Sequence, residues 1–270
     1  YGLVSSKQRK QLCMAWLLAI ATHFAPAASA QVSSIQAVNS SDEIDTNRPS
    51  FMFTPNTVPK GSLQLENGCL DSGLRRGRWG IDLPETQVRV GLRRSTEFQV
   101  FVPNFVLSRA SGNSISGVTD LSEIGIKQQL PTLGKLKSAI IASVNAPTGA
   151  TRLSLGGPCG ILRLQYTYAI NDKWCIGGMQ SLLLINHGRD VQWQPDILLS
   201  RSIGSKASAF LEYGGYFTSN NYPLNLIHLG AVYKITRNQQ IDSHCGFGLN
   251  QAAPSAFVGC GYSFRINGLF

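Results

Sequence analysis

The stretch of sequence that most constrains the fold is the last one, residues 255–270, in which apolar side chains alternate with small or polar ones. The apolar residues occupy every even position: Ala256, Val258, Cys260, Tyr262, Phe264 and Ile266. The positions between them hold Phe257, Gly259, Gly261, Ser263 and Arg265, so that Phe257 is the one bulky exception. Because successive side chains of a β-strand point to opposite faces, this alternation predicts a strand with one apolar and one wetter face.

The same alternation recurs along most of the chain and predicts about twelve strands. The alternating runs lie at residues 62–70, 87–93, 98–102, 123–130, 140–146, 162–170, 174–185, 191–200, 207–213, 227–236, 241–250 and 255–270. Residues 174–185 are apolar on both faces, so the sequence predicts a strand there without orienting it. Phe101 is a bulky exception on a polar face, and Pro195 predicts either a weaker strand or a bulge.

The links between these runs alternate in length. Tight turns are expected at 94–96, 131–135, 171–173, 204–206 and 237–239, and longer links at 71–82, 108–121, 147–158, 186–190, 218–224 and 250–254. Short turns that alternate with longer loops, together with an even strand count, are typical of transmembrane barrels. The sequence therefore predicts an all-β fold, an antiparallel transmembrane up-and-down β-barrel of about twelve strands. Its strand at 62–70 pairs with the strand at 255–270 and leaves no free sheet edge.

A soluble exported β-sandwich is the main alternative, since it also has many short alternating strands. The apolar faces argue against the sandwich because they carry almost no charge along any run. A Lys or Arg on the lipid-facing side of a barrel costs roughly 2–4 kcal/mol at the bilayer midplane. Sandwich strands have no comparable reason to keep charges off one face, so we expect the barrel.

The N-terminal residues have the pattern of a secretory signal peptide. Lys7, Arg9 and Lys10 precede a short apolar run at 12–22, and small residues follow at 28–30 as a cleavage site. The run is shorter than the about 20 apolar residues that a transmembrane helix needs. These three basic residues belong to a chain whose formal net charge is +9. Without residues 1–30, 21 basic and 15 acidic residues remain, so the net charge falls to +6. That mild excess, without basic clusters, predicts a surface next to anionic lipid and no nucleic-acid partner.

The expected domain organisation is a signal peptide at residues 1–30, a periplasmic arm at 31–61 and a transmembrane barrel at 62–270. Residues 31–58 are rich in Ser, Asn, Thr and Pro and show no sustained periodicity, which favours extended structure. Two interpretations of the arm are open. It folds into the periplasmic mouth as a partial plug, or it is a disordered tether.

Several short motifs occur in order along the chain after residue 30. They are Asp45-Thr46-Asn47-Arg48-Pro49, Val58-Pro59-Lys60-Gly61, Gln64-Leu65-Glu66, Asp120-Leu121-Ser122-Glu123-Ile124-Gly125-Ile126-Lys127, Pro147-Thr148-Gly149, Phe210-Leu211-Glu212-Tyr213, Gln240-Ile241-Asp242 and Gly248-Leu249-Asn250. The ordered set resembles the family of outer-membrane transporters named after the meta-pathway of phenol degradation. Asn47 departs from this resemblance, because an acidic residue is expected there, and the chain has more cysteines than expected.

The resemblance implies a barrel in the outer membrane of a Gram-negative bacterium that passes small, often aromatic or hydrophobic, molecules. It singles out Asp45, Arg48 and Pro49 as the arm motif. The implied partners are the lipid bilayer, the barrel-assembly machinery and a small-molecule solute. A terminal aromatic residue like Phe270 resembles the assembly signal of such barrels.

The predicted polar faces supply a set of candidate lumen-lining residues. They are Glu66, Arg89, Glu123, Lys127, Arg163, Asp196, Glu212, His228, Lys234, Asp242, His244 and Arg265. Barrels of about eight strands are filled by side chains and those of 16 to 18 strands hold a wide channel, so about twelve strands predict a narrow or plugged passage. Two interpretations are open: a selectivity lining, or an ion-paired core that conducts little. Across the closing strands we expect Arg265 and Glu66 to form an ion pair.

An enzyme, a metal site and a cofactor site are not predicted. A Ser-His catalytic pair would need both side chains on one face, and the neighbours Ser243 and His244 point to opposite faces of a strand. His228, His244 and Asp242 share a face, but no cysteine joins them, and the cysteine spacings match no metal motif. Cys245 and Cys260 are expected roughly opposite each other on the lipid face, either as a disulfide or as free thiols.

The function expected from all these features is passive passage of small solutes through an outer-membrane channel or transporter. No nucleotide site or energy-coupling motif is evident in the sequence, which favours diffusion. The alternative is a non-conducting structural or adhesive barrel whose outer loops bind a partner.

Overall fold

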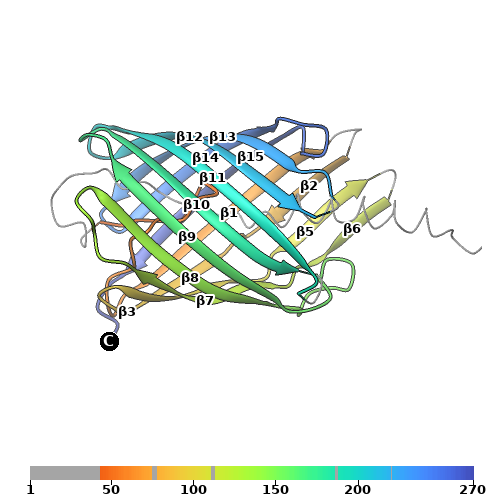
Figure 1. Ribbon diagram of the computed structural model, residues 1–270, viewed down its shortest axis with the longest axis horizontal. Coiled ribbons are helices and arrows are strands. Elements are labelled where there is room, and N and C mark those ends of the chain that lie inside the picture. Colours follow the sequence, from red (N-terminus) through yellow and green to blue (C-terminus); the bar gives the residue numbers. More distant parts are fainter. Residues whose placement is uncertain (1–42, 75–77, 111–112, 186–187, 220) are drawn as a thin grey trace, which may run out of the picture.

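The chain forms an antiparallel β-barrel with strongly tilted strands (Figure 1). The computed structural model describes residues 43–74, 78–110, 113–185, 188–219 and 221–270. The strand segments are β1 (Leu63–Leu74), β2 (Arg78–Leu83), β3 (Gln87–Arg93), β4 (Thr96–Phe101), β5 (Phe105–Ala110), β6 (Asn113–Val118), β7 (Leu121–Gln129), β8 (Leu136–Ala146), β9 (Cys159–Ala169), β10 (Trp174–Ile185), β11 (Asp190–Ile203), β12 (Ala207–Thr218), β13 (Leu224–Thr236), β14 (Gln239–Gly248) and β15 (Ala256–Ile266). Within the described residues, no helix is long and apolar enough to cross a membrane.

We call each full-length strand of the barrel wall a stave. Three staves are each divided into two segments, so the fifteen segments form twelve staves. β2 and β3 both pair with β1, β4 and β5 follow them, and β6 and β7 form the next stave. Pro84 and Pro103 lie in two of the breaks, where the missing N–H interrupts the ladder of hydrogen bonds. The predicted fold, an all-β up-and-down barrel of about twelve strands, is confirmed.

The first and last staves close the barrel. β1 and β15 run antiparallel, in register from Leu63 opposite Ile266 to Gly73 opposite Ala256. We refer to this β1–β15 pair as the seam. It is the pairing that the sequence predicted for the strands at 62–70 and 255–270.

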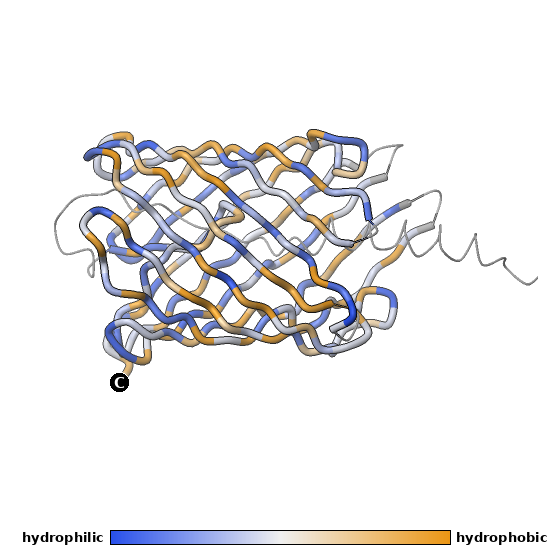
Figure 2. The backbone as a smooth tube through the Cα atoms, viewed as in Figure 1, coloured by the Kyte–Doolittle hydropathy of each residue, from blue (hydrophilic) through white to orange (hydrophobic). Residues whose placement is uncertain are grey.

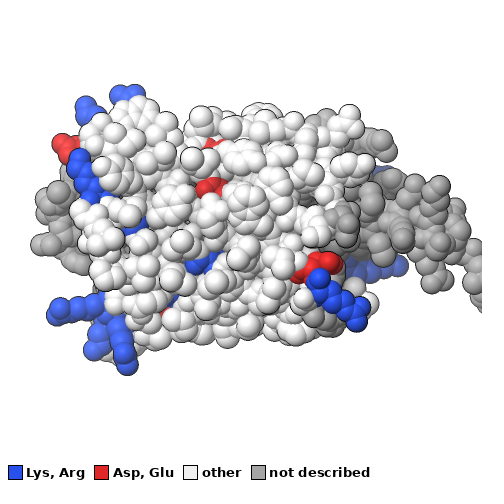
Figure 3. Space-filling model, viewed as in Figure 1, with Lys and Arg blue, Asp and Glu red and all other residues white. Residues whose placement is uncertain are grey.

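The outer wall of the barrel is apolar and the inner wall is polar. On β15, Val258 and Tyr262 are 56% and 40% exposed, whereas Ser263 and Arg265 on the opposite face are at most 6% exposed. Figure 2 shows this alternation along the tube, and on the face in Figure 3 most Lys and Arg lie at the barrel ends. Outward apolar side chains match a hydrocarbon environment, where lipid-facing charges are costly.

Two of the expected long links are mostly strand. β1 extends to Leu74 and β2 begins at Arg78, so most of the predicted link 71–82 is paired; β5 and β6 likewise occupy most of 108–121. These extensions carry polar residues on both faces, such as Asp71 and Ser72. Strand ends that project beyond the hydrocarbon region need no apolar face, so their sequence lacks the alternation that marks the other strands.

The described part of the arm, residues 43–61, runs inside the barrel (Figure 1). Its Phe51, Met52 and Phe53 are at most 6% exposed and pack in a cluster with inward apolar side chains of the wall. Two members of that cluster, Phe101 and Phe257, are the bulky exceptions on predicted polar faces. They face inward to contact the rings of Phe53 and Phe51, at centroid distances of 5.6 and 5.9 Å. Residues 1–30, the expected signal peptide, lie outside the described residues.

Candidate functional site

All candidate lumen-lining residues of the sequence analysis point into the barrel. Each is at most 7% exposed: Glu66, Arg89, Glu123, Lys127, Arg163, Asp196, Glu212, His228, Lys234, Asp242, His244 and Arg265. The structure gathers most of them into small groups, each joined to a neighbouring strand or to the arm.

One group lies where β1, β3, β4 and β7 adjoin. Arg89 binds Glu66 at 2.9 Å and Glu97 at 2.9 Å, and Lys127 Nζ lies 3.1 Å from Glu97. Glu97 is absent from the sequence prediction, although it shares the inward face of Gln99 and Phe101. Alternation is the signal that identifies it: Phe98 and Val100 point outward, so Glu97 must point inward.

A second group lies on β7, β8 and β9. Arg163 Nη1 contacts Glu123 Oε2 at 2.6 Å, and the Ser143 hydroxyl donates to Glu123 Oε1 at 2.7 Å. The Arg163 guanidinium also lies over the Phe53 ring, 5.1 Å from its centroid, which links the wall to the arm. Asp196, on β11, faces Gly214 across the pair with β12.

The importance of the second group can be tested with Arg163→Met. Removing one partner of a buried ion pair leaves the other charge uncompensated, so we expect the free energy of unfolding to fall by about 3 kcal/mol. Urea unfolding of the refolded protein, followed by tryptophan fluorescence, measures the loss. Arg189→Met, which removes an exposed arginine of an outer loop, should be nearly neutral. Equal stability of the two variants would contradict the assignment.

A third group joins β12, β13 and β14. Glu212 Oε2 lies 2.8 Å from His228 Nδ1, and His228 Nε2 lies 2.9 Å from His244 Nδ1. Glu212 also accepts hydrogen bonds at 2.8 Å from the backbone N–H groups of Phe51 and Met52. The histidine pair therefore contacts Glu212, and the carboxylate of Glu212 holds the arm through these backbone hydrogen bonds.

Arg48 anchors the arm at the inner side of the seam. Its guanidinium contacts Glu85 at 2.7 Å and Asp242 at 3.4 Å, and donates to the backbone oxygen of Cys260 at 3.2 Å. Burial alone would lower the pKa of Arg48, but the carboxylates of Glu85 and Asp242 outweigh it and raise that pKa above its ordinary value. The anchor is therefore positively charged at any physiological pH.

Two glycines make room for the Arg48 side chain. Gly68 and Gly261 are register partners on β1 and β15. A Cβ atom on Gly68 would collide with the guanidinium of Arg48, and one on Gly261 would collide with its Nε. We call this pair, with the arginine between its bare backbones, the glycine slot.

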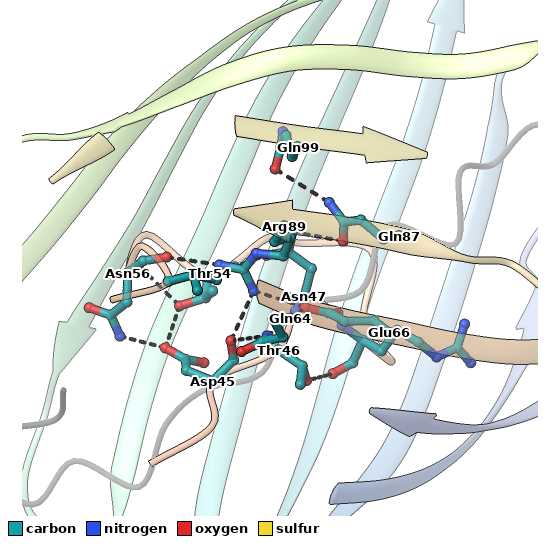
Figure 4. A network of polar contacts seen from close by, with 12 residues as sticks. Asp45, Thr46, Asn47, Thr54, Asn56, Gln64, Glu66, Gln87, Arg89 and Gln99 are labelled. Atoms are coloured by element: carbon teal, nitrogen blue, oxygen red, sulfur yellow. Dashed lines mark hydrogen bonds and ion pairs between the residues drawn. The ribbon is translucent and has the colours of Figure 1, made fainter. Parts of the chain in front are cut away.

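The rest of the arm motif shapes the arm itself (Figure 4). Asp45 accepts hydrogen bonds from Thr54 at 2.8 Å and from Asn56 at 2.6 Å, which folds residues 45–56 back on themselves. Pro49 is buried next to Arg48.

Asn47 replaces the acidic residue that the resemblance led us to expect. Its side-chain amide donates to Gln87 on β3, at 3.0 Å, and its carbonyl oxygen accepts from the backbone N–H of Thr54 at 3.3 Å. A carboxylate accepts hydrogen bonds only, so it would lack the donor that Gln87 needs. The amide is therefore suited to this place between arm and wall.

The expected Arg265–Glu66 ion pair is wrong for the described residues: Glu66 binds Arg89 and the arm backbone, while Arg265 lies opposite Gln64 and donates to the backbone oxygen of Glu43. The shift arises because the arm supplies nearer partners. Lys234 is also paired with Glu43, at 2.6 Å. Phe270 is 70% exposed, and its role as an assembly signal stays a prediction.

Cys245 and Cys260, which the sequence places roughly opposite each other, are not register partners. Cys245 lies opposite Val258, and Cys260 lies opposite Ser243 in the pair of β14 and β15. The two-residue offset follows from the 249–255 link, because alternation does not determine the residues at which the two strands end and begin. Across the seam, Cys260 faces Cys69 instead.

In the described part of the chain, no three His, Cys, Asp or Glu side chains form a group that could hold a metal ion. Ser243 is exposed on the outer wall and His244 is buried on the inner wall, so the two point away from each other as predicted. His228 forms hydrogen bonds with Glu212 and His244, and neither of these side chains carries a hydroxyl group that could act as a nucleophile.

The match to a known family decides the classification. The family model described as "Putative MetA-pathway of phenol degradation" matches residues 46–266. The chain belongs to this family. The predicted resemblance is thereby confirmed, and the match begins within the arm motif.

Solved outer-membrane structures share the fold of this family member. An outer membrane channel from Pseudomonas putida F1 is similar over 78% of this chain and 97% of its own, with a TM-score of 0.60 and 13% identity. The NanC porin is similar over 76% of this chain and 100% of its own, with a TM-score of 0.53 and 10% identity. The comparison with curated proteins found no match. The family, the closed barrel and the apolar outer wall are those of a Gram-negative outer-membrane protein, which confirms the predicted location.

Proposed function

We propose that this protein is a passive, non-enzymatic outer-membrane channel for small, aromatic or hydrophobic solutes, and that residues 43–61 act as a plug in its lumen. The observation that carries the proposal is the position of the arm, which crosses the interior of a closed barrel and is held there by side-chain contacts. Because these contacts are non-covalent, the arm can detach from the wall and return.

The solute class is supported by the two kinds of surface inside the barrel. The charged groups described above lie beside an apolar cluster that includes Phe51, Phe53, Phe101, Phe210 and Phe257. When the arm moves, the wall aromatics lose their partners and become available to an apolar or aromatic solute. Ligand sites are commonly lined by apolar and aromatic side chains with a few polar groups that fix orientation. The bilayer remains the lateral partner, and the assembly machinery stays a predicted one.

The alternative is a non-conducting structural or adhesive barrel. It is favoured by one observation, the filling of the described interior by paired charges and by the arm. An interior of this kind conducts little unless some part of it moves. The two functions therefore differ in whether the arm leaves the lumen under working conditions.

Solute flux through the refolded full chain tests the proposal. We expect single-channel steps in planar bilayers, and in liposomes faster swelling with phenolic solutes than with sugars of similar size. A variant that lacks residues 31–57 serves as the reference for an unplugged lumen and should conduct several-fold more. No current and no swelling from either protein, each verified as folded by its heat-dependent gel mobility, would favour the structural alternative.

A further inference from the structure

Two thiols face each other on the outer wall at the seam. Cys69 on β1 and Cys260 on β15 are direct register partners, and their Sγ atoms lie 3.5 Å apart. Both side chains are exposed, and both thiols are free. The seam is otherwise held by the hydrogen bonds of its backbone ladder and by contacts through the arm.

The backbone at this position suits a disulfide. Disulfide-bonded cysteines have Cα atoms about 4.4–6.8 Å apart. Directly opposed residues of an antiparallel pair have Cα atoms about 4.5 or 5.5 Å apart, so both values fall within that range. The sulfurs would need to approach by about 1.5 Å to reach the S–S bond length of about 2.05 Å. Rotation of the two side chains supplies that movement.

The other described cysteines lack such a partner. Cys159 lies opposite Asn145, and Cys175 lies opposite Ala169 and Ser200. Cys245 lies opposite Leu229 and Val258. Within the described residues, the seam is therefore the place where two thiols meet in register.

We propose that Cys69 and Cys260 form a disulfide that closes the barrel covalently at its seam. Exported proteins of Gram-negative bacteria mature in an oxidising compartment, which favours the bond. The oxidant is a second disulfide, that of a thiol–disulfide oxidoreductase or of a small molecule. The thiolate of one cysteine attacks it and forms a mixed disulfide, and the other thiolate then displaces the bound sulfur. Two protons and two electrons pass from the cysteines to the oxidant, which leaves as two thiols.

The bond would join positions that are 191 residues apart in sequence and so enclose nearly the whole barrel. It would also lie directly behind the arm anchor, because the backbone oxygen of Cys260 accepts a hydrogen bond from Arg48. A covalent seam holds β1 and β15 together while the arm detaches on the inner side. The disulfide is a modification of the wall and does not depend on the proposed solute.

Mass spectrometry of the full chain tests the bond. The protein is extracted from outer membranes without reductant, its free thiols are alkylated, and it is digested with trypsin. We expect peptide 61–75, which contains Cys69, to be linked to peptide 238–265. Because the second peptide contains both Cys245 and Cys260, the digest is repeated with Cys245→Ser, which should keep the link. Cys69→Ser and Cys260→Ser should each abolish it.

A stability measurement provides the second readout. The folded band of the oxidised protein should persist on gels to a temperature about 5–10 °C higher than after treatment with reductant. Cys260→Ser should show no dependence on reductant. Complete alkylation of both thiols, even after treatment with diamide, would overturn the proposal, as would a link from Cys69 to Cys245. A linked peptide without any thermal shift would overturn the claim that the bond holds the seam.

Discussion

Arg48→Met is expected to produce a channel that is open most of the time and carries several-fold more current than the natural protein. Methionine keeps much of the length of the arginine side chain but removes its charge. Glu85 and Asp242, whose side chains are at most 2% exposed, then face each other across the space without a cation. Water that enters when the arm leaves stabilises these carboxylates.

The size of the effect follows from the cost of a broken buried ion pair. Removing one partner of such a pair costs about 3–5 kcal/mol because an uncompensated charge stays buried. The penalty applies while the arm is seated and is relieved when the arm is released and the carboxylates are hydrated. A change of this size shifts the equilibrium between the two states by roughly 150- to 4,000-fold. A plug that is seated with a few kcal/mol to spare is therefore mostly released in the variant.

Single-channel recording in planar bilayers measures the open fraction directly. The matched control is Lys60→Met, which removes the same charge from an exposed position of the same arm and should leave the current unchanged. Glu85→Gln combined with Arg48→Met should return part of the closed time, since one buried carboxylate is then neutral. An open fraction like that of the natural protein, in a correctly folded Arg48→Met variant, would show that the ion pairs do not hold the plug.

The barrel itself was predictable from sequence because its lipid environment imposes a rule on every strand. Apolar side chains outward and polar side chains inward give a period of two, and that pattern located the staves and the seam strands. The rule fails where lipid is absent. The polar extensions around Asp71 and Ser72 were therefore taken for loops, although they are paired strand.

The interior was only partly predictable, because the arm decides how its charges pair. Alternation shows that Glu66 and Arg265 both point inward, but it carries no information about a segment that crosses the lumen. Glu66 binds the backbone N–H groups of Asn47 and Arg48, at 2.8 and 3.0 Å, in addition to Arg89. The aperiodic sequence of the arm gave no way to trace that path. The inward exceptions Phe101 and Phe257 were the one available signal, since phenylalanines that face a water-filled lumen would expose apolar surface to water.

The fit of the glycine slot gives the second large effect. Gly68→Ala adds one methyl group, and the nearest atoms that it would meet belong to the guanidinium of Arg48. The charge of the arm, its carboxylate partners and the outer wall are all retained. We expect the arginine to be displaced from the seam and the open fraction to rise, by less than in Arg48→Met, because overpacking costs about 1–3 kcal/mol.

Gly73→Ala on the same strand is the matched control. A methyl group there would meet its nearest neighbours at 3.5 Å or more, which is ordinary contact, so this variant shares the backbone effect of replacing glycine without any collision. If Gly68 acts through the arginine, then adding Gly68→Ala to Arg48→Met should change the open fraction little, because the group that the methyl displaces is gone. Additive effects of the two substitutions would instead show that Gly68 matters to the barrel wall and that the slot does not seat the arm. Non-additive effects would show that Arg48 holds the plug at the seam, where the chain closes the barrel and the arm crosses it.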